Sequence, residues 1–165
     1  MTMQYTSIYE SPLGKILLAA DDEGLTGLWF DKEKYYALGL AKEHAPKETP
    51  AIQAAKRWLD AYFAGEQPET LPPLHMIGTP FQQDVWNILL TIPSGTTTTY
   101  GEIADRLAQQ RGRARMSAQA VGGAVGHNEI SIIVPCHRVV GKNGSLTGYA
   151  GGIDKKTYLL KLEGG

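Results

Sequence analysis

The sequence is poor in cysteine, because its 165 residues contain one thiol, Cys136. A single cysteine excludes an intramolecular disulfide, so nothing in the composition requires an oxidising compartment. Long apolar runs are missing too, since no stretch approaches the roughly 18 residues that span a bilayer. The N-terminal MTMQYTSIYE lacks a basic segment followed by an apolar one and is not typical of a signal peptide. These absences predict a cytoplasmic protein without membrane association.

An excess of charge of either sign is also absent, and the formal net charge is −1. The balance hides an asymmetry. Residues 1–78 carry 7 Lys and Arg against 11 Asp and Glu, whereas residues 79–165 carry 9 against 6. A positive second half is typical of a domain that meets an anion such as a nucleic-acid backbone, but chance also produces differences of this size. Charge alone leaves both interpretations open.

The first half of the chain predicts a strand meander followed by a helix. Residues 5–30 alternate short apolar runs with turn sequences such as DDEG, which indicates three antiparallel strands. Thr49 and Pro50 suit the N-cap and the first position of an amphipathic helix. The proline-rich EQPETLPPLH follows and predicts a boundary between an N-terminal domain, 1–74, and a second domain, 79–165.

The second half predicts helices that begin after Thr79, at Tyr100 and after Ser117, with a basic loop between the last two. Two short helices joined by a loop and followed by the strand-like run 132–134 suggest a helix-turn-helix with a wing. Unrelated helix pairs are common in enzymes, so the pattern by itself leaves DNA binding open. The fold class predicted for the whole chain is α+β.

The helix that follows Ser117 consists mostly of residues with small side chains or none. Its sequence AQAVGGAVG places Val121 and Val125 one turn apart, which assigns them to the core. The opposite face offers Gln119 as its one long side chain, whereas base reading in the major groove needs several polar side chains. A bare face permits close approach, either to another helix or to the minor groove of DNA. Both interpretations are open at this level.

The single thiol lies in IIVPCHRVVG, where Cys136 and His137 follow an apolar, strand-like run. The thiolate is the reactive form, and a neighbouring base can generate it. Adjacent side chains on an extended segment point in opposite directions, so His137 cannot easily contact Cys136 directly, although a bridging water could relay the proton. No metal site is predicted, because the four histidines are scattered and no second cysteine exists. An inert buried cysteine, an acyl-transfer hydrolase and direct attack on an electrophile all stay open.

Longer stretches of the second half resemble a known family. PCHRVVGKNGSLTGYAGG, with SAQAVGGAVGHNEISIIV before it and YLLKLEG after it, is similar to the O6-alkylguanine-DNA alkyltransferases, which repair DNA in a single turnover. The similarity runs through residues 79–164 and includes TPFQQDVW and IPSGTTTTYGEIA. Residues 1–78 match the family's small ribonuclease-H-like domain only in outline. The resemblance implies that domain followed by a helical winged helix-turn-helix domain.

The resemblance implies irreversible transfer of a methyl or larger alkyl group from O6-alkylguanine, and less readily from O4-alkylthymine, to the protein's own cysteine. It assigns Cys136 as the nucleophile, His137 as the base that acts through water, and Glu163 as the group that orients His137. It implies no cofactor and no metal. The implied partner is double-stranded DNA that contains O6-alkylguanine, bound by a monomer.

Further roles carry over to the pocket and to the DNA interface. The target base lies inside a duplex and must be rotated out. Tyr100 resembles the tyrosine that crowds the 3′ phosphate, and Asn128 resembles the asparagine that ties the helix-turn-helix to the active-site segment. The expected substrate-binding groups are the carbonyls of Cys136 and Val139, the side chain of Tyr149 and the N–H of Ala150. The expected DNA contacts are Tyr100, Ala118, Gln119, Ala120, Gly122, Gly123, Arg111, Arg113 and Arg115.

Three positions depart from the commonest family pattern. Gln119 stands where arginine is common, so the side chain expected to enter the base stack is uncharged. Glu129 and Ser131 replace prolines, which predicts a more mobile loop before the cysteine.

Two rival functions stay open. One is a non-catalytic alkyltransferase-like lesion binder, which Cys136 argues against, and the other is a small cysteine hydrolase that turns over repeatedly and ignores DNA.

Overall fold

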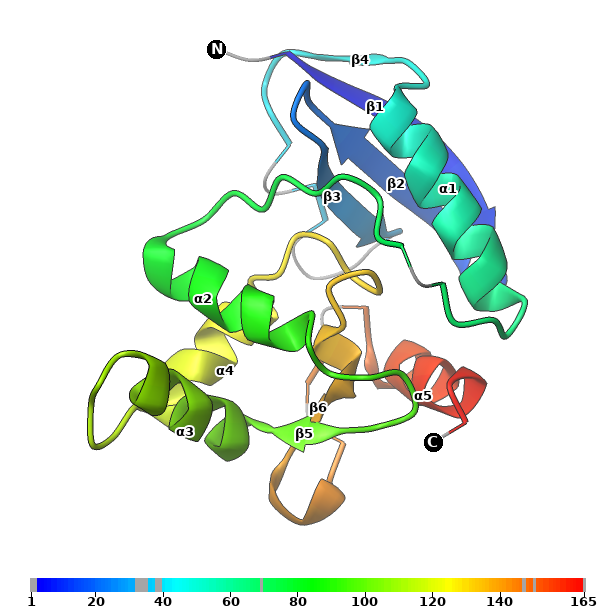
Figure 1. Ribbon diagram of the computed structural model, residues 1–165. Coiled ribbons are helices and arrows are strands. Elements are labelled where there is room, and N and C mark those ends of the chain that lie inside the picture. The colour runs from blue at the N-terminus through cyan, green and yellow to red at the C-terminus, as the bar shows by residue number, and fades with distance from the viewer. Residues whose placement is uncertain are drawn as a thin grey trace. The chain divides into compact units, whose positions relative to one another are not determined.

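The computed structural model describes residues 3–31, 36–37, 40–68, 70–146, 148–149 and 151–164. These residues form helices and strands of an α+β fold, which confirms the predicted class (Figure 1). The chain divides into two compact units. One runs as far as Ile77 and also includes Glu129–Ser131, and the other comprises Gly78–Asn128 and the residues from Ile132 onward. The expected domains, 1–74 and 79–165, stay a prediction, and within the second of them residues 129–131 form a short excursion into the first unit.

A four-stranded sheet with the order β3-β2-β1-β4 forms the first unit. Strands β1 (Gln4–Ser11), β2 (Gly14–Ala20) and β3 (Leu25–Phe30) make the predicted antiparallel meander. Strand β4 (His44–Pro46) pairs in parallel with β1. The sequence does not predict β4, because three residues without a run of β-branched or aromatic side chains give no strand signal.

Helix α1 (Pro50–Phe63) packs along this sheet (Figure 1). The Thr49 hydroxyl accepts a hydrogen bond from the Ile52 N–H, which confirms the predicted N-cap. Ile52 and Leu59 are completely buried on the face that meets the sheet. Burial of such side chains supplies most of the stabilisation of a small domain of this kind.

The excursion at residues 129–131 lies beside β3. The Leu28 N–H donates to the Glu129 carbonyl at 2.8 Å, and the Ser131 N–H donates to the Leu28 carbonyl at 3.2 Å. Leu28 and Ile130 also form a parallel bridge. A proline at 131 has no N–H and could not make the second bond. These contacts fasten the loop that the sequence predicted to be mobile.

The second unit is mainly helical, and Thr79 and Ser117 cap its helices as predicted. The indole N–H of Trp86 donates to the Ala124 carbonyl at 2.9 Å and so joins the helix that follows Thr79 to the helix that follows Ser117. In the residues that the structure describes, no helix has both the length and the apolar character needed to cross a membrane. The α-helices are α2 (Pro80–Leu89), α3 (Tyr100–Gln110), α4 (Ala118–Gly126) and α5 (Ile153–Leu162).

Short elements surround the thiol. Strands β5 (Thr98–Thr99) and β6 (Val139–Val140) pair in parallel, and the 3-10 helices η1 (Cys136–Arg138) and η2 (Lys142–Gly144) flank β6. The strand predicted at 132–134 is wrong, since this run forms turns. The carbonyl of Val134 accepts from the Asn128 side chain and from the Cys136 N–H, so local bonds occupy an acceptor that a strand would offer to its neighbour.

Candidate active site

Cys136 stands on a tight turn. It begins η1 directly after Pro135, and 7% of its surface is exposed. Its N–H donates to the Val134 carbonyl at 2.8 Å, and the Arg138 N–H donates to the Pro135 carbonyl at 3.0 Å. These two bonds curl the backbone, so the extended geometry expected for Cys136 and His137 is wrong. Pro135 favours the turn because its ring restricts φ, which is −81° here.

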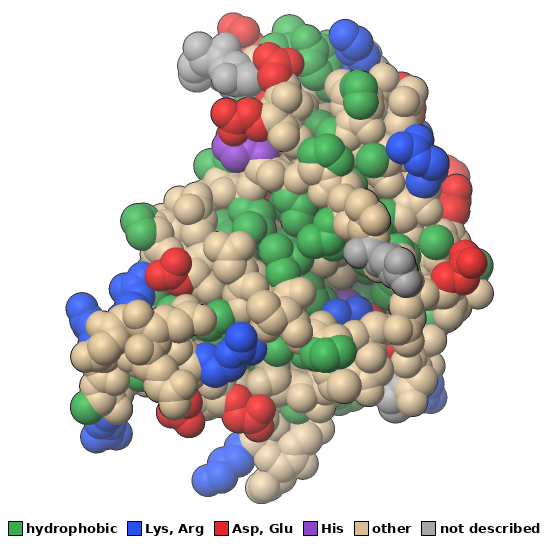
Figure 2. Space-filling view, viewed as in Figure 1, with side chains coloured by type: hydrophobic (Ala, Val, Ile, Leu, Met, Phe, Trp, Pro, Cys, Tyr) green, Lys and Arg blue, Asp and Glu red, His purple; other side chains and the backbone are tan. Residues whose placement is uncertain are grey.

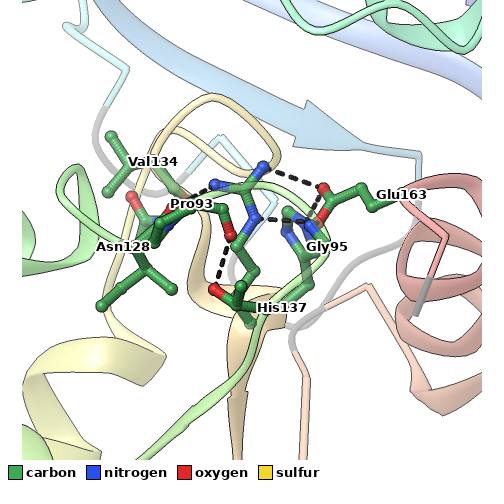
Figure 3. A network of polar contacts seen from close by, with 9 residues as sticks. Pro93, Gly95, Asn128, Val134, His137 and Glu163 are labelled. Carbon is green, nitrogen blue, oxygen red and sulfur yellow. Dashed lines mark hydrogen bonds and ion pairs between the residues drawn. The ribbon is translucent and has the colours of Figure 1, made fainter.

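His137 is held by a carboxylate at one nitrogen only. Its Nε2 lies 2.6 Å from Oε2 of Glu163, and the two side chains point toward one another in Figure 3. A neutral imidazole donates to a carboxylate through Nε2–H, so Nδ1 keeps its lone pair. Among the described residues Nδ1 has no hydrogen-bond partner. The residue thus presents a buried proton acceptor next to Cys136 in the chain.

Electrostatics keep this acceptor neutral. Burial lowers the pKa of His137 below its ordinary value of 6.5, and the charges of Arg138 and Lys156 lower it further. The hydrogen bond to Glu163 and its negative charge act in the opposite direction but do not outweigh burial. At neutral pH the imidazole is therefore uncharged and able to accept a proton.

Arg138 fixes the carboxylate of Glu163. Its Nε and Nη2 donate to the two carboxylate oxygens at 2.8 and 3.0 Å, and its Nη1 donates to the Ile92 carbonyl at 2.6 Å. A two-point pair of this kind sets the plane of the carboxylate as well as its position. The Gly95 N–H lies 3.4 Å from Oε1 of the same group. The sequence analysis did not assign a role to Arg138. Its position directly after Cys136 and His137 is the one signal that could have pointed to it.

Lys156 is a second cation that sequence reasoning missed. It is completely buried in α5, and its Nζ donates to the Val139 carbonyl at 2.6 Å. Burial lowers the pKa of Lys156, whereas the negative charge of a Cys136 thiolate raises it. The interaction is mutual, so a charged Lys156 stabilises the thiolate. A lysine in a helix is usually exposed, so its burial could not be predicted from the sequence.

The expected pocket groups gather around the same turn. The ring of Tyr149 meets the ring of His137 edge-on, with centroids 6.5 Å apart. The Cys136 carbonyl accepts from the Val139 N–H, and the Val139 carbonyl accepts from Lys156. A carbonyl oxygen has two lone pairs, so each can still accept a hydrogen bond from a base. Ala150, the expected donor to O6, lies outside the described residues.

Asn128 joins the end of α4 to the segment before the thiol. Its Nδ2 donates to the Val134 carbonyl at 2.8 Å, and Figure 3 shows the two residues side by side. Asn128 is buried, so this bond is protected from water. The link that the family resemblance implied for this asparagine therefore has a matching contact here.

The bare face of α4 is open. Ala118, Gln119, Ala120 and Gly123 are exposed, whereas Val121 and Val125 are buried as predicted. A Cβ at Gly122 would lie 3.7 Å from the ring of Tyr100, which places this tyrosine beside the face. Helix α4 packs against α2 and α3 through its buried side, so packing within the described residues does not explain the missing side chains. An external partner that approaches closely does explain them.

The arginines of the basic loop between α3 and α4 differ in whether they form an ion pair within the protein. Nη2 of Arg111 lies 2.7 Å from Oδ2 of Asp84, and its guanidinium lies over the ring of Phe81. Arg113 and Arg115 are exposed and have no ion-pair partner within the described ranges. Figure 2 shows basic side chains at the edge of the molecule near this loop. These two arginines are therefore better placed than Arg111 to meet a phosphate.

Two family models match the chain, one to each unit. The model of the 6-O-methylguanine DNA methyltransferase DNA-binding domain matches residues 80–165, and that of the ribonuclease-like domain of the same proteins matches residues 4–75. The chain belongs to the 6-O-methylguanine DNA methyltransferase family. This confirms the family that the sequence resembles.

Individual members of the family are similar along nearly the whole chain. The methylated-DNA–protein-cysteine methyltransferase of Methanosarcina acetivorans is 48% identical over 97% of this chain and 98% of its own length. The crystal structure of the Mycobacterium tuberculosis O6-methylguanine methyltransferase has a TM-score of 0.83 at 46% identity and covers 98% of this chain and 93% of its own. A structure of the M. tuberculosis protein in complex with DNA has a TM-score of 0.81 at 45% identity, with 98% and 92% covered.

Proposed function

We propose that this member of the family repairs double-stranded DNA by moving an alkyl group from O6 of guanine to Cys136, once per molecule and irreversibly. The observation that carries the proposal is the buried, neutral His137, whose Nε2 is held by Glu163 while Nδ1 has no partner among the described residues. If Cys136 were only an inert core residue, nothing would require a buried, neutral base next to it in the chain. O4-alkylthymine is a poorer substrate of the same site.

The proton and the alkyl group move in opposite directions. The Cys136 thiol loses its proton through a bound water to Nδ1 of His137, and Glu163 stabilises the imidazolium that forms. The sulfur attacks the alkyl carbon, so a carbon–sulfur bond forms as the bond to O6 breaks. The electron pair stays on the guanine, which takes up the proton that the Cys136 thiol gave to His137 and remains in the DNA as the normal base. The thioether on Cys136 has no route back, which makes the reaction single-turnover.

The surrounding charges favour this step. Lys156 stabilises the thiolate. Arg138 holds the Glu163 carboxylate, which in turn holds the His137 imidazole in position. Negative charge develops on O6 as the bond breaks, so hydrogen-bond donors near O6 lower the barrier. Tyr149 lies beside His137 and is one such donor, and the N–H of Ala150 is the other that we propose.

The base reaches Cys136 after it leaves the stack. We propose that α4 enters the minor groove with its bare face, since Ala118, Ala120, Gly122 and Gly123 allow the backbone to come close. Gln119 fills the space that the base vacates, and Tyr100 crowds the adjacent phosphate. Arg113 and Arg115 bind phosphates, with Arg111 held back by Asp84. A monomer is sufficient for all of these roles, and a cytoplasmic location stays a prediction.

Intact mass measurement after incubation with an O6-methylguanine duplex tests the proposal. One equivalent of duplex should add one methyl group, peptide mapping should place it on Cys136, and further duplex should leave the mass unchanged. Cys136→Ala should bind the duplex without gaining mass. Repeated turnover would instead indicate a cysteine hydrolase, and binding without transfer would indicate a lesion binder.

A further inference from the structure

A contact of Glu129 has no part in the mechanism above. The indole N–H of Trp29 donates to Oε2 of Glu129 at 2.5 Å, across 100 positions of the sequence. Trp29 is completely buried in β3, and Glu129 is half-buried. The backbone bonds of Leu28 to Glu129 and to Ser131 flank this contact. Residues 129–131 are therefore fixed to β3 by a side chain as well as by the backbone.

Strand β3 is built to accommodate the indole. A Cβ on Gly27 would lie 2.0 Å from Cη2 of Trp29, so the ring lies directly over this glycine. Residues two apart on a strand share a face, and a side chain at 27 would occupy the place of the ring. The glycine thus leaves room for the orientation in which Trp29 reaches Glu129.

The backbone is strained immediately after the fastened segment. Ile132 has a φ of 69°, in the left-handed region that a β-branched residue rarely adopts. Such a conformation persists only where its surroundings enforce it. The contacts of residues 129–131 with β3 act before Ile132, and the bond from Asn128 to the Val134 carbonyl acts after it. Cys136 follows Val134 by two residues.

We propose that Trp29 and Glu129 are positioning residues for alkyl transfer, whose hydrogen bond holds the strained turn at Ile132 and so places the Cys136 thiol for His137. The inference rests on the proposed function of Cys136. Without the bond, only the backbone bonds to Leu28 and the Asn128 bond to the Val134 carbonyl hold the turn, so the strained φ of Ile132 is enforced less firmly and the backbone of 132–135 becomes free to shift. The thiol then leaves the position from which its proton reaches His137. The bare face of α4 and the basic loop take no part, so DNA affinity does not change.

Substitutions of Glu129 give the sharpest test. Glu129→Ala removes the acceptor at a half-buried position and should slow the single-turnover reaction with O6-benzylguanine by about tenfold, because the effect acts on the reacting geometry. Glu129→Gln keeps an oxygen that accepts from the indole and should stay within about threefold of the wild-type rate. Glu129→Asp keeps the charge but is one methylene too short, and should behave like Glu129→Ala. Affinity for an unmodified duplex should be the same in all three.

Trp29→Phe provides the second arm, and Trp58 provides its control. Trp58 is a buried tryptophan of the same unit whose indole N–H has no hydrogen-bond partner in the described part of the chain. Trp58→Phe should leave the rate near wild type, whereas Trp29→Phe should slow it. If the two residues act through one bond, the double variant Trp29→Phe, Glu129→Ala should be no slower than the slower single variant.

The outcomes separate this inference from the function on which it rests. A wild-type protein that takes no alkyl group from O6-benzylguanine or duplex would overturn the proposed function. A wild-type protein that reacts, with Glu129→Ala and Glu129→Asp reacting equally fast, would overturn the positioning role alone. A loss of rate that follows the loss of folded protein in thermal unfolding, with duplex affinity falling in parallel, would overturn it too. If Glu129→Ala does not fold, the comparison of Glu129→Asp with Glu129→Gln decides.

Discussion

His137 and Glu163 are 26 residues apart in the sequence, yet Nε2 of one lies 2.6 Å from Oε2 of the other. Both groups are almost completely buried, and Arg138 holds the carboxylate from its other side. The arrangement joins a base to an orienting group and a cation, so that stability and reactivity depend on the same three side chains. The consequences can be measured separately.

Glu163→Gln should reduce both stability and rate. The substitution leaves the Arg138 guanidinium buried without its counter-charge, which costs about 3 kcal/mol of the free energy of unfolding by comparison with other broken buried pairs. The reaction with O6-benzylguanine should slow as well, because a neutral amide does not stabilise the imidazolium. Urea unfolding and single-turnover kinetics measure the two effects. Asp105→Asn, an exposed acidic position on α3, is the control and should change neither.

The pH dependence of stability should reveal the environment of His137. Burial lowers its pKa in the folded state below 6.5, so at acid pH the unfolded chain binds a proton that the folded chain does not. The free energy of unfolding should therefore rise with pH between the lowered pKa and 6.5, and this contribution should be complete above 6.5. Urea unfolding at a series of pH values tests the sign. In His137→Gln the slope should be smaller, and an unchanged slope would show that other groups cause it.

The reaction rate should follow the same group. A neutral His137 accepts the thiol proton, so the reaction with O6-benzylguanine should stay fast below pH 6.5 and fall only when the lowered pKa of His137 is reached. Single-turnover rates across the acid range provide the measurement. A midpoint at or above 6.5 would contradict the lowered pKa.

Gln119 should affect duplex repair but not the free base. A free O6-benzylguanine base needs no flipping, so Gln119→Gly should leave its reaction unchanged while it slows repair of an O6-methylguanine duplex. Gln119→Arg should maintain or raise the rate of duplex repair, because a cation at this position stabilises the duplex from which the base has been rotated out. Gln53→Gly, an exposed position on α1, controls for the cost of glycine in a helix. Equal slowing of both substrates by Gln119→Gly would show that residue 119 supports the pocket.

Arg113 and Arg115 should dominate the salt dependence of duplex binding. Each phosphate contact that is lost should reduce the slope of log affinity against log salt concentration by about 1. Arg113→Gln and Arg115→Gln should therefore flatten the slope, and Arg111→Gln should do so less because Asp84 already pairs with it. Arg57→Gln, an exposed arginine on α1, is the matched control. A slope that changes only in Arg111→Gln would reverse the assignment.

The elements with local signals could be predicted from the sequence. Thr49, Thr79 and Ser117 cap the helices that follow them, because a hydroxyl that satisfies an N–H three residues on is a purely local interaction. The predicted strand at 132–134 failed for the opposite reason. An apolar run is buried in a strand or in a turn alike, and the bonds that accompany the turn here come from Leu28 and Asn128, which the run itself does not reveal.

The sequence alone determined the chemistry available to this protein: one thiol next to a histidine, a helix face without side chains, and two family domains in order. Tertiary structure alone decided that Arg138 pairs with Glu163, that Lys156 is buried against the Val139 carbonyl, and that Glu129 bonds to Trp29. Caps and periodic patterns act over a few residues and can be recognised along the chain. Burial and charge pairing depend on which distant segments meet, and they set the pKa of His137 and the place of Cys136.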